Sequence, residues 1–414
     1  MRELVRRIDS ATPADRDRAV DALRALAIAG VVLGHWLVTA MVSDSGTLYG
    51  ASPLRHMPQF APVSWVFQTL AVFFLVGGHV GARSHASARA RGESYGRWLR
   101  ARLLRLLRPV VVVLLVWALA AGAMLASGTD PDTVRALCGL VWSPLWFLVV
   151  FAALTATTPL VAALHPLWPF AVVLVTDVYR FGLDGSAGLA WINVPAGWLV
   201  PYCLGAAWAR GELCGRRTGW TLLLGGTAAT AGLVLWAGYP AAMVGVPGEK
   251  ISNLDPPTLA AVTFGLAQCG AALLLLAPLR RLLRRPVLWA PVAMTNLSAM
   301  TVFLWHQTAL IAVTAVGLLP GGPLPGLHTA PDTPGWILAR LAWLPVFAAV
   351  LLICWAAFRG YEQRRPPRGG AVVRKGRPGP PTPRRVADRQ AREASASLSA
   401  VRGPAERRQA GDAA

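Results

Sequence analysis

The sequence predicts an all-α fold, a polytopic membrane bundle of about ten transmembrane helices with both termini in the cytoplasm. Composition is the first reason: hydrophobic residues make up 55% of the 414 residues and charged residues only 14%, whereas soluble domains carry about 25% charged residues. Mean hydropathy is +0.48. The other two reasons are the apolar runs along the chain and the alternation of arginines between them.

Ten apolar runs long enough to suggest membrane helices can be drawn along the chain. They lie near residues 21–42, 64–83, 107–127, 144–164, 167–181, 188–209, 219–238, 258–278, 292–318 and 336–358. We therefore divide the chain into a cytoplasmic N-terminal segment (1–20), a transmembrane domain (21–358) and a C-terminal tail (359–414).

Arginines fix the expected orientation of the bundle. Eight arginines against Glu93 lie in the connection from Arg83 to Arg108, and further arginines follow the sixth and eighth runs. The alternate connections are poor in arginine. Because basic connections stay in the cytoplasm, both termini are expected there, in agreement with the even number of runs.

The net charge of +20 does not indicate a nucleic-acid partner. The arginines cluster between apolar runs and in the tail, and do not form a folded basic face interleaved with aromatic residues. Abundant Arg, Ala, Gly and Pro beside only two lysines are typical of a GC-rich bacterial genome. We expect a multi-pass protein of the bacterial cell membrane.

The tail holds fourteen Arg and Lys, five Asp and Glu, and almost no large apolar residues. Such a segment cannot bury enough apolar surface to fold alone. We expect a disordered cytoplasmic tail that helps to fix topology; binding to anionic lipid headgroups is the alternative.

Arg24 and His35 stand in the first apolar run and are eleven residues apart. On a helix this spacing places both side chains on nearly the same face, roughly 16 Å apart along the axis. Ionisable groups at membrane depth are costly and usually mark a pathway or a reaction. Imidazole suits proton transfer because it titrates near neutrality. Asp21 can pair with Arg24 at i, i+3. The alternatives are a snorkelling Arg24 and a buried, structural His35.

Arg102, Arg105 and Arg108 repeat at intervals of three before Pro109. Successive arginines then stay on one side of a helix, at the expected cytoplasmic mouth of the third run. Guanidinium groups bind phosphate in a bidentate manner, so this repeat is a candidate phosphate site. A cluster that only fixes topology is the alternative.

Three further features could contribute to a site. Gly77 and Gly78 allow the close approach of a backbone or a ligand, and His79 follows them directly. His306 places a second imidazole inside the membrane. Trp146 opens the fourth run, where an interfacial aromatic belt is the alternative. For the two histidines the alternatives are structural.

The order of these motifs resembles the acyltransferase-3 family of integral membrane acyltransferases, of the actinobacterial type. The resemblance rests on an Arg-x10-His first helix, a Phe73-Phe74-Leu-Val-Gly77-Gly78 segment, the Arg-x-x-Arg repeat, Trp146-Phe-Leu and Leu-Trp-His306. It spans most of residues 17–358. The second motif departs from the family pattern FFxxSGF, because Gly77 stands at the serine position and His79 at the aromatic one.

The resemblance implies an enzyme that transfers acyl groups other than amino-acyl groups. Carried over by position, Arg24 and His35 would be catalytic, and Arg102, Arg105, Gly77 and Gly78 would bind the donor, acyl-CoA, from the cytoplasmic side. Asp21, His79, Trp146 and His306 would be accessory. The acceptor would be a hydroxyl of a carbohydrate, a lipid or a small molecule. His35 would act as general base or as transient acyl carrier, and Arg24 would orient the donor or polarise its carbonyl.

No permanently bound cofactor and no metal is expected. The five cysteines are scattered and show no CxxC spacing. Two other functions remain open from sequence alone: a multi-pass transporter or flippase, in which intramembrane ionisable groups are also common, and a non-catalytic membrane scaffold that acts through its basic tail.

Overall fold

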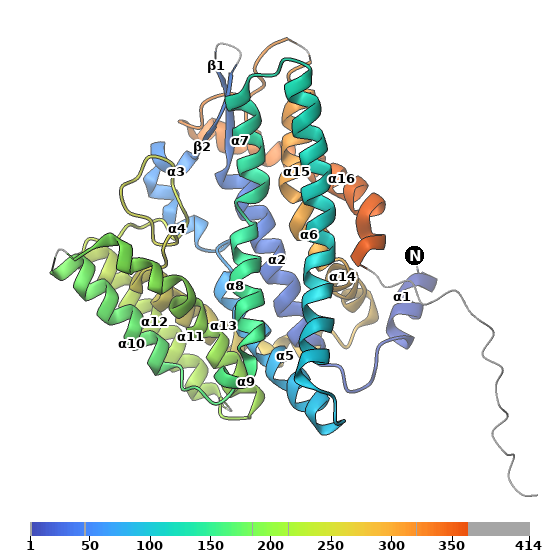
Figure 1. Ribbon diagram of the computed structural model, residues 1–414, viewed down its shortest axis with the longest axis vertical. Helices are drawn as coiled ribbons and strands as arrows, with labels where there is room; N and C mark the ends of the chain where they lie inside the picture. The colour runs from blue at the N-terminus through green and yellow to red at the C-terminus, as the bar shows by residue number, and fades with distance from the viewer. Residues whose placement is uncertain (1, 45–46, 184, 214, 320, 363–414) are drawn as a thin grey trace, which may run out of the picture. The chain divides into compact units, whose positions relative to one another are not determined.

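A computed structural model of the chain describes residues 2–44, 47–183, 185–213, 215–319 and 321–362, and these residues are almost entirely helical (Figure 1). The helices and strands are α1 (Arg2–Ser10), α2 (Arg18–Val38), β1 (Ala40–Asp44), β2 (Thr47–Ala51), α3 (Pro53–His56), η1 (Pro58–Phe60), α4 (Ala61–Ser64), α5 (Leu70–Ala90), α6 (Tyr95–Ala126), α7 (Pro131–Trp142), α8 (Leu145–Ala156), α9 (Thr158–Val161), α10 (Leu167–Asp177), η2 (Val178–Gly182), η3 (Ala187–Ile192), α11 (Asn193–Ala209), α12 (Arg216–Trp236), α13 (Leu259–Leu282), α14 (Pro286–Leu297), α15 (Ala299–Gly317) and α16 (Pro334–Glu362).

Eight helical stretches of the described chain are long and apolar enough to cross a membrane, which confirms the predicted polytopic all-α bundle. They are α2, α6, α7 with α8, η3 with α11, α12, α13, α15 and α16. The other two predicted runs are α5, whose second half carries Arg83 and Arg89, and α10, which has only 11 residues. The ten predicted runs thus all correspond to helices, eight of which have the composition of a full span.

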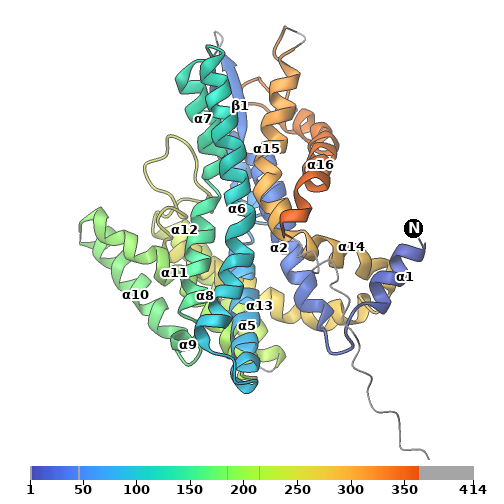
Figure 2. The same cartoon turned by 45° about the vertical axis from the view of Figure 1, so that its right-hand side comes forward.

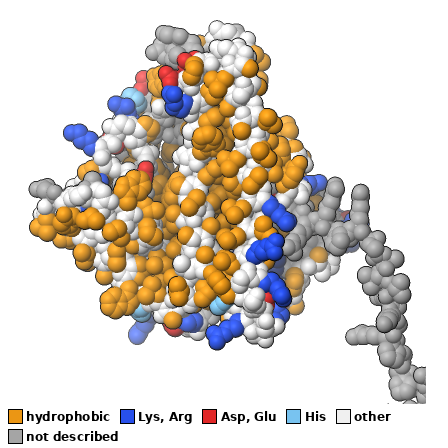
Figure 3. Space-filling model, viewed as in Figure 1, with side chains coloured by type: hydrophobic (Ala, Val, Ile, Leu, Met, Phe, Trp, Pro, Cys, Tyr) orange, Lys and Arg blue, Asp and Glu red, His pale blue; other side chains and the backbone are white. Residues whose placement is uncertain are grey.

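The basic connections lie at one edge of the bundle. Arg280 at the end of α13 pairs with Asp17 at the start of α2, with 2.6 Å between Nη2 and Oδ2. Arg97, Arg100, Arg105 and Arg108 are exposed on the first half of α6, and Lys and Arg side chains gather along the lower part of the face in Figure 3. Apolar side chains cover most of the rest of that face. The cytoplasmic location of this edge stays a prediction.

The fourth span starts earlier than the sequence predicted. It runs from Pro131 to Ala156 and not from 144 to 164, because Asp130 caps its amino terminus by accepting a hydrogen bond from Thr133 N at 2.9 Å. Asp132 and Arg135, which precede the predicted run, lie on this helix and pair on its exposed surface.

The predicted run 292–318 is two helices, α14 and α15, separated at Ser298. The carboxylate of Glu362, at the end of α16, accepts hydrogen bonds from the backbone N–H groups of Met300 and Thr301 at 3.0 and 2.9 Å. It thereby satisfies donors that the start of a helix leaves free. The folded domain therefore extends past residue 358, and the rest of the predicted tail lies outside the described residues.

Short elements that the sequence analysis did not predict follow α2. Strands β1 and β2 form an antiparallel hairpin in which Ala40 pairs with Ala51, and α3, η1 and α4 lead to α5. Helix α5 begins at Leu70, later than the predicted residue 64, and Thr69 Oγ1 donates a hydrogen bond to the carbonyl of Ala27 at 2.7 Å. Because Ala27 lies between Arg24 and His35 on α2, the chain enters α5 at the depth of the middle of α2.

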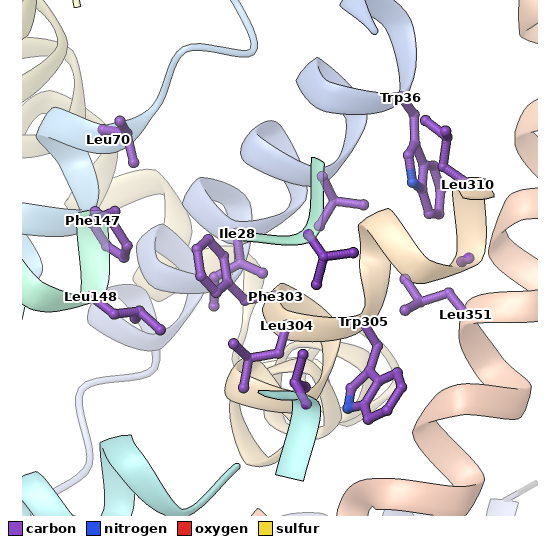
Figure 4. Close-up of a cluster of buried hydrophobic side chains, with 14 of the residues drawn as sticks. Ile28, Trp36, Leu70, Phe147, Leu148, Phe303, Leu304, Trp305, Leu310 and Leu351 are labelled. Carbon is purple, nitrogen blue, oxygen red and sulfur yellow. The ribbon is translucent and has the colours of Figure 1, made fainter. Parts of the chain in front are cut away.

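Helix α2 lies at the centre of the main core and is packed against α5, α13, α14, α15 and α16 (Figures 1 and 2). The core cluster joins Ile28 of α2 to Phe147 of α8 and to Phe303 and Trp305 of α15 (Figure 4). Burial of such large side chains contributes about 1.5–3 kcal/mol each in water. Within a bilayer, close packing replaces that contribution. The arrangement brings the first apolar run beside the ninth.

Candidate active site

Arg24 lies near the basic edge and is held by two polar partners. Its Nε donates a hydrogen bond to Oδ1 of Asn296 on α14, and its Nη2 lies 3.6 Å from Asp21 Oδ1. Asn296 in turn donates to the carbonyl of Asp21 at 2.7 Å. The Arg24 side chain is surrounded by protein but keeps 30% of its surface accessible. A positioned guanidinium with accessible surface can still bind an anion.

Asp21 is shared between two arginines. Besides its contact with Arg24, it accepts hydrogen bonds from Arg16 Nε at 2.5 Å and Nη2 at 3.1 Å. The side-chain pairing of Asp21 and Arg24 predicted from their i, i+3 spacing is present, but the shorter contact of Asp21 is with Arg16.

His35 lies three turns beyond Arg24 on α2. The distance from its Nδ1 to Nε2 of Gln307 on α15 is 3.2 Å. Protein atoms enclose the ring, yet part of its surface stays accessible. Among the described residues Nε2 of His35 has no hydrogen-bond partner, so this nitrogen is available to a substrate.

His306 lies beside His35, with 5.0 Å between the two ring centroids and 44° between the ring planes. Its Nδ1 is 2.5 Å from the carbonyl of Phe303. Since a carbonyl only accepts hydrogen bonds, Nδ1 carries the proton, and Nε2 of the neutral ring presents a lone pair. That Nε2 is buried and has no hydrogen-bond partner among the described side chains. The structure therefore brings the two predicted intramembrane imidazoles together.

Aromatic side chains extend from this histidine pair toward α5. Phe303 lies 5.9 Å from His306 and 5.5 Å from Phe147, measured between ring centroids. Trp146 contacts Trp198 at 6.0 Å and Phe147 at 6.4 Å. The sequence predicted that Trp146 opens the fourth span. Because α7 precedes α8 in the same span, Trp146 instead lies within it. These rings form a series of aromatic contacts that begins at His306, the neighbour of His35.

Arg102 and Arg105 of α6 lie close enough to Arg24 to interact with it electrostatically. Arg102 is half-buried; it donates to the carbonyl of Val80 at 3.4 Å and lies 5.8 Å from the Trp98 ring centroid. Arg105 is exposed and has no hydrogen bond or ion pair with the described residues. Three arginines from two helices, α2 and α6, thus share one region of positive charge at the basic edge.

Gly77 and Gly78 lie where α5 meets other helices. A Cβ built on Gly78 would be 2.0 Å from the carbonyl oxygen of Tyr202 on α11, and one on Gly77 would be 2.5 Å from the Phe151 ring. Only glycine permits such an approach of two backbones. His79 stacks on Trp208 of α11 at 3.8 Å between ring centroids. The contacts made by both glycines are therefore helix–helix contacts, and donor binding by them stays a prediction.

No cluster of three or more His, Cys, Asp or Glu side chains within the described ranges could hold a metal ion. The chemistry available at this site is that of two imidazoles, two amides, one carboxylate and three guanidinium groups. Such a set can transfer a proton and hold an anion.

Comparison with known proteins identifies the family of the chain. A family model described as an acyltransferase domain matches residues 17–359. The chain belongs to the acyltransferase-3 family. The match covers α2 through almost all of α16 and so includes every candidate residue above. No curated protein and no solved structure matches the chain.

Membership of the acyltransferase-3 family makes this protein an acyltransferase, and its eight apolar spans make it an integral membrane protein. The resemblance inferred from the five motifs is confirmed. An enzyme is favoured over the transporter and the scaffold that the sequence alone had left open.

Two polar residues that contact the site were not predicted as site residues. Asn296 contacts Arg24 from 272 positions away, and Gln307 contacts His35 from the same separation. The sequence places the amide of Gln307 inside the membrane, directly after His306 in an apolar run, but does not indicate its contact with His35. Asn296 lies near a break between helices that the hydropathy pattern does not reveal.

Proposed function

We propose that this acyltransferase moves an acyl group, acetyl or another short acyl, from acyl-CoA on the cytoplasmic side to a hydroxyl of a glycan, a lipid or a secondary metabolite. We place it in the bacterial cell membrane. The observation that carries the proposal is an accessible imidazole, His35, on the same helix as Arg24, which shares a region of positive charge at the basic edge with Arg102 and Arg105 of α6.

The positive region formed by Arg24, Arg102 and Arg105 supports binding of the phosphates of the donor. Arginines bind phosphate oxygens through paired N–H groups, and Arg105 has all of its donors free of partners among the described residues. The thioester, at the far end of the extended arm of coenzyme A, would then reach into the bundle beside His35. Acyl-CoA is a substrate here and not a bound cofactor.

His35 acts as general base in this scheme. Its Nε2 takes the proton of the acceptor hydroxyl while that oxygen attacks the thioester carbonyl carbon. The carbon–sulfur bond breaks, and the imidazolium returns the proton to the leaving thiolate, so the products are the acyl ester and free coenzyme A. A positioned general acid–base contributes about 10²–10⁴-fold to such a step.

The spacing along α2 separates the roles of Arg24 and His35. About 16 Å of helix lies between them, more than one side chain can bridge. Arg24 therefore suits the orientation of the donor, and the alternative in which it polarises a carbonyl beside His35 is less favoured. Asn296 and Asp21 hold the guanidinium in place for this task.

Protein reconstituted in liposomes, with radiolabelled acyl-CoA and a cell-envelope extract as acceptor, tests the proposal. We expect label to move to the extract without any ion gradient, and His35→Ala to lower the turnover at least 100-fold while the protein stays inserted. Transfer that requires a gradient would favour a transporter, and undiminished turnover by His35→Ala would refute the role of His35. Label retained on the protein after acid quenching would indicate that His35 is an acyl carrier.

A further inference from the structure

We infer that Gln307 is a positioning residue that determines which nitrogen of His35 is basic during turnover. The inference rests on the proposed function of His35 as general base. It concerns the side chain of α15 that meets His35 Nδ1 at 3.2 Å.

The bonding of Gln307 is unusual for a buried amide. The residue is 2% exposed, and the contact with His35 is the one side-chain hydrogen bond of Gln307 with the described residues, since Oε1 has no partner. An unpaired buried polar atom costs about 1–3 kcal/mol. An apolar residue of similar size would avoid that cost, so stability does not explain an amide at this position.

The orientation of the Gln307 amide determines which ring nitrogen of a neutral His35 carries the proton. If Gln307 donates its N–H to Nδ1, His35 carries its proton on Nε2 and offers no lone pair to a substrate. If the amide rotates and presents Oε1, it accepts from Nδ1–H, and Nε2 holds the lone pair.

Only the second arrangement is compatible with turnover. Once Nε2 has taken a proton, both ring nitrogens of His35 carry hydrogen, and a second N–H group facing Nδ1 would be repelled. A carbonyl oxygen facing Nδ1 stabilises the imidazolium, as the hydrogen-bond partner of a ligating or catalytic histidine commonly does. Gln307 therefore has to present Oε1 for His35 to act as base.

Few other groups can compete for this role. His306 of α15 is the titratable side chain in contact with the His35 ring, and its own Nδ1 is committed to the Phe303 carbonyl. Arg340 of α16 binds the backbone carbonyls of Trp36 and Thr39. Arg24 lies three turns away. In the described part of α5, α13 and α14, no charged group contacts the ring.

Two substitutions of Gln307 and one control test the inference. Gln307→Glu keeps the size and supplies a carboxylate, and Gln307→Leu removes the hydrogen bond. Thr308→Val is the matched control on α15, because it removes a different, partly buried hydrogen bond, that from Trp117 Nε1 to Thr308 Oγ1 at 3.0 Å. Turnover is measured with labelled acyl-CoA across pH, together with ¹⁵N spectra of histidine-labelled protein assigned by comparison with His35→Ala.

We expect Gln307→Glu to remain active and to move the acidic limb of the pH–rate profile to higher pH by about 1–3 units, because a carboxylate favours the imidazolium. Gln307→Leu should lower kcat by about 10- to 100-fold with an unchanged KM for acyl-CoA, and should convert the His35 spectrum from an Nδ1–H form to a mixture. Thr308→Val should leave the pH profile in place.

An unshifted pH profile in Gln307→Glu, together with wild-type kcat in Gln307→Leu, would overturn the inference while leaving the proposed function intact if His35→Ala is inactive. An active His35→Ala would instead remove the proposed function. If Gln307→Leu does not fold, the profile of Gln307→Glu and the wild-type spectrum still decide the question.

Discussion

Two arginines inside the spans of this protein have opposite environments. Arg340 of α16 is fully buried, and its guanidinium donates to three backbone carbonyls: Trp36 at 2.6 Å, Gly326 at 2.9 Å and Thr39. Arg24 shares a carboxylate and one amide and keeps accessible surface. The hydrogen-bond donors of Arg340 connect the end of α2 to α16. Some of the donors of Arg24 remain available to a ligand.

The same contrast separates two histidines, His328 and His35. His328 uses both ring nitrogens: Nε2 lies 2.8 Å from the Thr314 carbonyl, and Nδ1 accepts from Leu324 N at 3.1 Å. His35 has one nitrogen without a partner among the described residues. A buried ionisable group is thus no sufficient sign of a site; free bonding capacity and accessible surface distinguish the functional pair from the structural one.

The largest effect is expected when Arg340, the structural arginine of this comparison, is replaced, and it is an effect on stability. Arg340→Met should lower the free energy of unfolding by about 3 kcal/mol or more, because three buried carbonyls lose a charged donor. Turnover per folded molecule should change less than fivefold. Thermal melting in detergent beside a radiolabel assay measures both, and a stable but inactive variant would contradict the structural role.

Gly78 should behave as a purely structural position. Gly78→Ala places a Cβ against the Tyr202 carbonyl, and overpacking of this kind costs about 1–3 kcal/mol. We expect a lower melting temperature and an unchanged KM for acyl-CoA. Gly96→Ala is the matched control, because a Cβ at Gly96 would meet nothing within 4 Å. A raised KM at wild-type stability would instead support the predicted contact of Gly78 with the donor.

Arg105 should behave as a ligand-binding position. Arg105→Ala is expected to raise the KM for acyl-CoA about tenfold, equivalent to about 1.4 kcal/mol, with kcat within twofold and no loss of stability. Arg135→Ala is the control, because Arg135 is an exposed arginine that pairs with Asp132 on α7. This substitution should leave the KM for acyl-CoA unchanged. Equal effects of both substitutions would show that general positive charge, and not this site, attracts the donor.

The smallest effect concerns the ion pair of Asp17 at the start of α2. Partial burial raises the pKa of Asp17, but hydrogen bonds from Arg280 and from the first turn of α2 lower it by more, so the net pKa lies below its ordinary value. The stability it contributes is present above the unfolded pKa and is lost as pH falls through the folded one.

Asp17→Asn keeps a good N-cap and should therefore cost only about 0.5 kcal/mol at pH 7, because Arg280 is half exposed. Melting curves at pH 7 and near pH 3 measure the difference, which should shrink at the lower pH. A difference that is constant with pH would show that the ion pair contributes nothing.

The sequence predicted the elements whose signal is local. Apolar length located the helices, the arginines located one edge, and the spacing of Arg24 and His35 placed them on one helix. The start of α7 is set by the N-cap residue Asp130 and by Pro131 at the first helical position, and hydropathy detects neither signal.

Partners far apart in the chain could not be predicted from one sequence. Asn296, Gln307 and Arg340 meet α2 from about 270 to 300 positions away, and periodicity carries no information about such contacts. Arg340 looked like a residue of an apolar run, and only its three carbonyl partners reveal its structural role.

One paired measurement tests the central claim most directly: acyl transfer per folded molecule for His35→Ala and His328→Ala, with the melting temperature of each. We predict that His35→Ala loses transfer at least 100-fold at nearly wild-type stability. His328→Ala should lose stability while its folded fraction transfers acyl groups normally. Transfer retained in His35→Ala, or lost equally in both variants at equal stability, would contradict this account.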